Sequence, residues 1–123
     1  MPRLFAAGIA FTILLSGCSH YIEPPRDSTD AATLVGRGGA YVYRVDGEDV
    51  ASARKVSPEN GNRVRVNAGS HQLKVTVVGV HPATWNFKWD AKPAKTYVIE
   101  PTTGPAVGLT VTDQNTGRKE PVK

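Results

Sequence analysis

Apolar and polar residues alternate in short runs along most of this chain, and this period of two constrains the fold more than any other feature. In the segment 63–67, Val64 and Val66 lie on one face, while Arg63 and Arg65 lie on the other. Successive side chains of a β-strand point to opposite faces of a sheet, so such a run predicts a strand with one buried face. The chain is therefore expected to fold mainly as β-sheet.

The next run, 71–80, alternates in the same way, with Leu73, Val75 and Val77 on the apolar face. Ala68-Gly69-Ser70 separates it from the segment 63–67. Because a short loop that contains glycine commonly joins two antiparallel strands, we expect these two segments to form a hairpin.

A third alternating segment, TWNFKWDA, places Trp85, Phe87 and Trp89 on one face of a strand. On a helix the three rings would diverge, so the strand is the better interpretation. Further strands are predicted at 40–45, 95–101 and 107–113, the first ending at the turn sequence Asp46-Gly47. The expected core is led by six residues: Leu73, Val75, Trp85, Phe87, Trp89 and Tyr97.

Six or seven short strands separated by Gly, Pro or Asp predict an all-β fold, a small antiparallel β-sandwich over residues 34–114. The segment 48–56 is compatible with a helical turn, but we favour an irregular edge strand or loop. The polar tail, residues 115–123, is expected to fray.

The first 18 residues have a different character. Arg3 is followed by an uncharged run from Leu4 to Leu15, and then by small residues before Cys18, the only cysteine of the chain. This is the pattern of a secretory signal peptide, expected here over residues 1–17. The apolar run is shorter than the ~20 residues that a membrane-spanning helix needs.

Leu15-Ser16-Gly17-Cys18 resembles the lipobox of bacterial lipoproteins. The resemblance implies cleavage between Gly17 and Cys18, a diacylglyceryl group on the Cys18 sulfur, and often a further acyl chain on the new amino group. Two or more acyl chains anchor a protein stably to a membrane. Ser19, in place of an aspartate, implies transfer to the outer membrane with the domain facing the periplasm. The segment 18–33, which contains Pro24-Pro25, is expected to be a flexible tether.

A second resemblance concerns the domain itself. VRVNAGSHQLKVTV (64–77) and VYRVDGEDV (42–50) are similar to the core of PEGA-type repeats, which are small β-sandwich modules, although Ala68 stands where those repeats usually have proline. The resemblance implies the fold and says almost nothing about function.

Few residues suggest chemistry. The net charge of +4 is scattered without a long basic run, which argues against nucleic acid as a partner. The serines lack a nucleophile motif, so no enzymatic activity is expected. The histidines are not spaced as metal ligands, so neither a metal nor a cofactor is expected. They are His20, His71 and His81, of which His71 is expected to hydrogen-bond locally beside a turn.

These observations predict a membrane-anchored, non-catalytic binding or structural module of the cell envelope. The favoured partner is an envelope protein, contacted through an exposed sheet edge. The alternative is carbohydrate, peptidoglycan or another cell-wall polymer, stacked on Trp85 and Trp89. Two residues four positions apart on a strand are separated by about 13 Å. The same spacing is found when the side chains on one face of a strand are buried in the core, and we favour this burial for the two rings.

Overall fold

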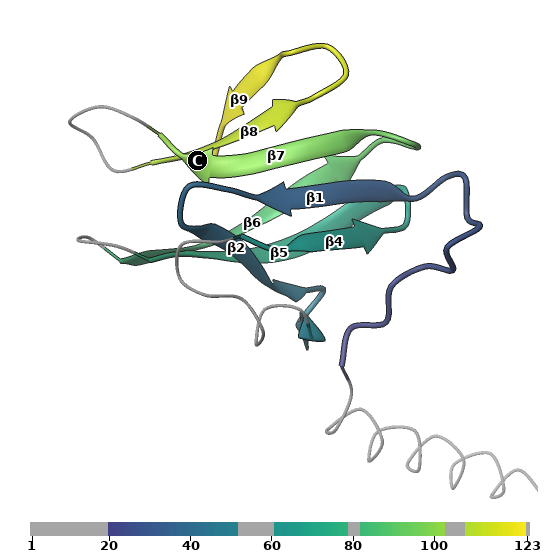
Figure 1. The fold of residues 1–123 in the computed structure, drawn as a ribbon. Coiled ribbons are helices and arrows are strands. Elements are labelled where there is room, and N and C mark those ends of the chain that lie inside the picture. Colours follow the sequence, from purple (N-terminus) through teal and green to yellow (C-terminus); the bar gives the residue numbers. More distant parts are fainter. Residues whose placement is uncertain (1–19, 52–60, 79–81, 103–107, 123) are drawn as a thin grey trace, which may run out of the picture.

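The computed structural model describes residues 20–51, 61–78, 82–102 and 108–122, which form two β-sheets packed face to face (Figure 1). The described strands are β1 (Ala32–Gly36), β2 (Ala40–Val45), β3 (Glu48–Asp49), β4 (Arg63–Val66), β5 (Gly69–Val77), β6 (Ala83–Ala91), β7 (Thr96–Pro101), β8 (Leu109–Asp113) and β9 (Lys119–Pro121). The expected β-sandwich is confirmed.

One sheet has five strands in the order β4-β1-β7-β8-β9, and the other has four in the order β3-β2-β5-β6. All neighbours are antiparallel except β1 and β7, which are parallel. Two strands lie where none was expected: β1 begins inside the predicted tether, and β9 lies in the tail that was expected to fray. The ambiguous segment 48–56 begins with the two-residue edge strand β3, and residues 52–60 lie outside the described residues.

The predicted hairpin between 63–67 and 71–80 is wrong. Strand β4 pairs with β1 in the five-stranded sheet, whereas β5 pairs with β2 and β6 in the other sheet. The chain crosses between the sheets at Asn67 and Ala68, and Gly69 then adopts a φ of 126°. Alternation shows that each strand has a buried face. It does not show whether two successive strands pair in the same sheet, so it could not distinguish a hairpin from a crossing between the sheets.

The core lies between the sheets and consists mainly of aliphatic side chains from both of them. Its largest fully buried members are Leu34, Leu73, Ile99, Leu109, Val42, Val45, Val64, Val66, Val75 and Val111. Of the six expected core residues, Leu73, Val75, Phe87 and Tyr97 are buried, whereas Trp85 and Trp89 are partly buried at the margin. Burial of each aliphatic or aromatic side chain contributes about 1.5–3 kcal/mol, so aliphatic residues dominate the stabilisation.

Asp46 and Gly47 form the tight turn between β2 and β3, as the sequence predicted. Their φ angles are 53° and 82°, both in the left-handed region. Positive φ at both central residues is the property of the type I′ turn, which matches the twist of the strands it joins. This turn places the Asp46 side chain beside the start of β5.

Candidate functional site

The edges of the two sheets are the natural places to look for a binding surface, because an edge strand carries unpaired backbone N–H and C=O groups. The four edges are β3 and β6 in one sheet and β4 and β9 in the other. Strand β9 has only three residues and ends at Pro121, which lacks an N–H. Strand β3 has two residues, and its Asp49 carbonyl accepts a hydrogen bond from the Tyr21 N–H at 2.8 Å. Neither edge offers a long template for another strand.

The edge of β4 is covered by residues 20–28, which we call the N-terminal strap. The Arg65 N–H donates to Glu23 Oε1 at 2.7 Å, and the Arg65 carbonyl accepts from the Tyr21 hydroxyl at 2.6 Å. The Arg65 guanidinium in turn donates to three backbone carbonyls of the strap at 3.0–3.1 Å, those of Pro24, Pro25 and Ser28. The strap therefore lies against the domain from His20 onward, which differs from the flexible tether expected there.

Strand β6 is the exception. It has nine residues and pairs along its whole length with β5, and no other described strand pairs with it. It is the longest edge in the described part of the chain. It also lies at the opposite end of its sheet from β3, and so away from the strap.

Two backbone hydrogen bonds of β5 and its C-terminal neighbour show which backbone groups of β6 point outward. The Gln72 carbonyl accepts from the Asp46 N–H at 2.7 Å, and the Val78 N–H donates to the Gly39 carbonyl at 3.0 Å. Both bonds lie on the β2 side of β5. Alternate residues of an antiparallel strand direct their backbone groups to opposite sides, so the even-numbered residues of β5 serve β2 and the odd-numbered ones serve β6.

The register pairs Leu73 with Phe87 and Val75 with Trp85, which joins odd-numbered residues of both strands. The even-numbered residues of β6 therefore direct both their N–H and their C=O toward the free edge. These four residues also have exposed side chains, and they are Thr84, Asn86, Lys88 and Asp90. The edge is thus an open row of backbone donors and acceptors.

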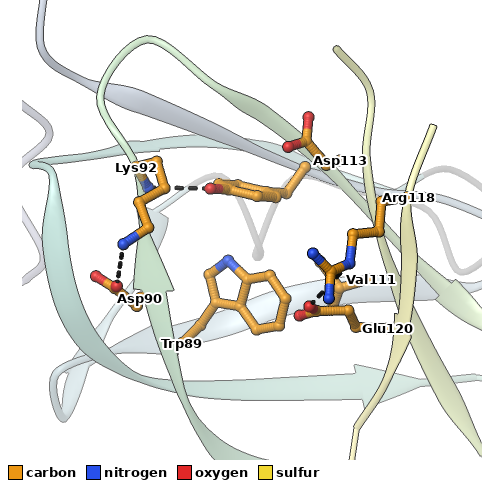
Figure 2. A pocket seen from close by; sticks show the side chains of 8 residues that line it. Trp89, Asp90, Lys92, Val111, Asp113, Arg118 and Glu120 are labelled. Carbon is orange, nitrogen blue, oxygen red and sulfur yellow. Dashed lines mark hydrogen bonds and ion pairs between the residues drawn. The ribbon is translucent and has the colours of Figure 1, made fainter. Parts of the chain in front are cut away.

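A cavity of about 190 Å³ lies beside β6, between this strand and the hairpin formed by β8 and β9. Trp89 forms one wall, and its ring meets that of Tyr97 edge to face, with centroids 5.4 Å apart and an interplanar angle of 79°. Figure 2 shows Asp90 and Lys92 on one side of Trp89, and Arg118 and Glu120 on the other. Within the described residues, the buried Trp89 Nε1 has no hydrogen-bond partner.

The charges around this cavity are mostly paired with one another. Lys92 Nζ lies 2.6 Å from Asp90 Oδ2, and Arg118 Nε lies 3.6 Å from Glu120 Oε1. Because each charge has an opposite neighbour, the cavity has no strong field of one sign, and it suits a neutral side chain or sugar better than an ion. A second hollow continues along β6 past Trp89 and is bounded across the gap by Pro121 and Val122.

The predicted local role of His71 is confirmed. Its Nδ1 lies 2.7 Å from Asp46 Oδ2, and its Nε2 lies 2.6 Å from the Asn67 carbonyl oxygen. The other Asp46 oxygen accepts the Gln72 N–H at 2.8 Å. Burial alone would raise the pKa of Asp46, but the hydrogen bonds from His71 and Gln72 outweigh it and lower this pKa. Both ring nitrogens face acceptors, so His71 joins the β2–β3 turn to β5.

The remaining predicted sites are placed as follows. Trp85 and Trp89 share the inner side of β6 with Phe87 and are partly buried. Gly17, Cys18 and His81 lie outside the described residues. In the described ranges, no group of three or more His, Cys, Asp or Glu side chains could hold a metal ion. Those ranges also contain no helix that is long and apolar enough to cross a membrane.

The chain matches no family model, and no curated protein or solved structure is significantly similar to it. The similarity to PEGA-type repeats therefore stays a prediction.

Proposed function

We propose that this protein is a lipid-anchored, non-catalytic module of the bacterial envelope that binds a partner protein by adding a strand to β6. The observation that carries the proposal is the open edge of β6. The edges β3 and β9 are short, and β4 is covered by the N-terminal strap, whereas nine residues of β6 are left free on one side. Acylation of Cys18 would hold the module at the membrane.

Strand addition uses backbone hydrogen bonds for affinity and neighbouring hollows for specificity. The free edge of β6 supplies the backbone groups of Asn86, Lys88 and their even-numbered neighbours. The hollows beside Trp89 lie on the inner side of the same strand. Every second side chain of an added strand would point toward that inner side, and an apolar or neutral polar side chain suits the paired charges there.

The proposal is tested by crosslinking in intact cells, with a photoreactive amino acid in place of Lys88 and, as the control, in place of Lys119 on β9. Both lysines are exposed on edge strands. We expect the probe at residue 88 to capture a discrete envelope protein that the probe at residue 119 does not capture. Equal capture at both positions would show that β6 is not the contact.

Two variants at Asn86 separate backbone pairing from side-chain contact. Asn86→Pro removes an N–H that points to the free edge, whereas Asn86→Ala removes the side chain and keeps this N–H. We expect Asn86→Pro to abolish the crosslink from residue 88 and Asn86→Ala to retain it. If proline leaves the crosslink unchanged, the partner does not pair with the backbone of β6.

A second candidate function is binding of a neutral saccharide of the cell wall, and the cavity beside Trp89 favours it. An aromatic wall with polar groups around it is a common way to hold a sugar ring. The test is retention of the acylated protein on insoluble peptidoglycan at high salt, which screens diffuse charge attraction. Retention that is lost in Trp89→Ala but kept in Asn86→Pro would support this function over strand addition.

A further inference from the structure

We propose that the N-terminal strap fixes the orientation of the domain on the bilayer, with the β3–β4 side against the lipid surface and the β6 edge facing away from it. The inference rests on the proposed function in one respect, the acylation of Cys18. It adds the part of the surface that touches lipid and the part left open to a partner.

The length of chain between the lipid and the domain is the first argument. A flexible tether of about 14 residues could span roughly 45–50 Å and would let the domain turn freely. In the structure, the backbone of His20 already forms an isolated parallel β-bridge with Asp49 of β3, and the Tyr21 N–H donates to the carbonyl of the same residue. Only Ser19 separates Cys18 from His20, a distance of about 7 Å when fully extended. The domain is therefore held close to the membrane.

The second argument is where the strap attaches. It bonds to Asp49 on β3 and to Arg65 on β4, which are edge strands of different sheets. In each sheet the opposite edge is a different strand, β6 in one and β9 in the other. Figure 1 shows the strap running beside β4, with the hairpin of β8 and β9 on the far side. Acyl chains attached to Cys18, just before the strap, thus lie across the sandwich from the β6 edge.

The third argument is Ile22. This residue is 86 % exposed, and it is the one exposed large apolar residue in the part of the chain that the structure describes. Both of its neighbours are held: the Tyr21 hydroxyl bonds to the Arg65 carbonyl, and Glu23 accepts the Arg65 N–H. Ile22 is therefore held outward, four residues after the acylated cysteine. Entry of an apolar side chain in that place into the boundary between head groups and acyl chains is favourable, because it removes apolar surface from water.

The experiment uses the full chain, acylated in bacteria and reconstituted into vesicles of phosphatidylethanolamine and phosphatidylglycerol. An environment-sensitive fluorophore is attached to a cysteine introduced as Ile22→Cys or as Asn86→Cys, because the Cys18 sulfur is blocked once acylated. We expect spin-labelled lipid to quench the probe at residue 22 severalfold more strongly than the probe at residue 86. An aqueous quencher should show the reverse order.

A strap variant, Tyr21→Phe with Arg65→Ala, is the matched control in both labelled backgrounds. It should remove the difference between the two positions while the protein stays bound to the vesicles. Equal quenching in the intact protein would overturn the orientation, and a difference that survives in the strap variant would overturn the role of the strap. Mass spectrometry of the same sample separates these outcomes from an unmodified Cys18, which would overturn the anchoring and with it the inference.

Discussion

The side-chain amide of Asn62 pairs with the backbone of Val42 as a residue of a neighbouring strand would. Asn62 Nδ2 donates to the Val42 carbonyl and Asn62 Oδ1 accepts from the Val42 N–H, both at 2.8 Å. The pairing lies next to the shift of register between Val42 and Arg44 in β2. The Asn62 carbonyl also accepts from the Gly36 N–H at the end of β1. One buried residue thus joins the two sheets, because its side-chain amide bonds to β2 and its backbone carbonyl bonds to β1.

Replacing Asn62 should be among the most damaging single changes in the domain. Asn62→Ala leaves the buried N–H and C=O of Val42 without these partners, at about 1–3 kcal/mol for each group. We expect the free energy of unfolding, measured by urea denaturation, to fall by about 3 kcal/mol or more. Asn67→Ala, an exposed control, should change it by less than about 0.5 kcal/mol. Similar values for both variants would show that the amide pairing is not stabilising.

Close approach between Gly61 and Gly36 gives a second prediction. A Cβ atom added at Gly61 would overlap the backbone carbonyl of Gly36, so Gly61→Ala must displace the backbone. Gly117→Ala is the control, because a Cβ there meets nothing within 4 Å and the only cost is its φ of 78°. That cost is about 1–2 kcal/mol. Gly61→Ala should lower the midpoint of thermal unfolding clearly more than Gly117→Ala, and the reverse order would contradict the packing described.

Local pattern was sufficient to predict most of the strands and the turn at Asp46-Gly47, because period and turn chemistry are properties of neighbouring residues. It was not sufficient for the link between β4 and β5. Val64 and Leu73 each face the core, but they do so from opposite sheets. A hairpin and a crossing between sheets bury the same residues, so only tertiary pairing distinguishes them.

The candidate site was predictable only in outline. Sequence reasoning pointed to an exposed sheet edge and to the side of β6 that carries Trp85 and Trp89. It missed the N-terminal strap, because the partners of Arg65 lie about 40 residues earlier in the chain and nothing in their local sequence marks them. It also missed Asn62, since a buried pairing amide and a loop asparagine have the same local context.

We expect the carboxyl of Asp46 to contribute to the loss of folding stability in acid. Its burial acts to raise its pKa, but hydrogen bonds from His71 and Gln72 lower it below the ordinary value of 3.8. A carboxyl with a lowered folded-state pKa stabilises the fold fully above the unfolded pKa and loses this contribution as the pH falls through the folded value. Asp46→Asn should therefore be less stable than the wild type at neutral pH, with a difference that shrinks below pH 3.8. A difference in unfolding free energy that is constant with pH would refute this.

We expect the N-terminal strap to be held less firmly at alkaline pH, when the phenol of Tyr21 ionises. Burial raises its pKa from 10.0 to about 12, with further increases from the charges of Glu23, Asp46 and Glu48. The folded state thus holds this proton more tightly, so docking of the strap is fully present below pH 10.0 and weakens as the pH rises toward about 12. In a spectrophotometric titration, Tyr21→Phe should remove the component with the highest midpoint. Loss of a component near pH 10.0 would contradict the buried, hydrogen-bonded phenol.

Proline substitutions test whether one side of β6 is free. Asn86 directs its N–H to the free edge, so Asn86→Pro removes no bond to β5, whereas Phe87→Pro removes a ladder bond and the buried ring together. Alanine variants at the same positions remove the side chains and keep both N–H groups. The additional loss of stability on going from alanine to proline should be small at residue 86 and about 1–3 kcal/mol at residue 87, where a backbone carbonyl of β5 loses its donor.

Both variants at a position lack the native side chain, so the difference in unfolding free energy between proline and alanine reports the loss of the backbone hydrogen bond. Urea denaturation of the four variants measures this difference. An additional loss at residue 86 as large as that at residue 87 would mean that the N–H of Asn86 is already paired. The edge of β6 would then be closed, and strand addition at β6 would have no donor there to use.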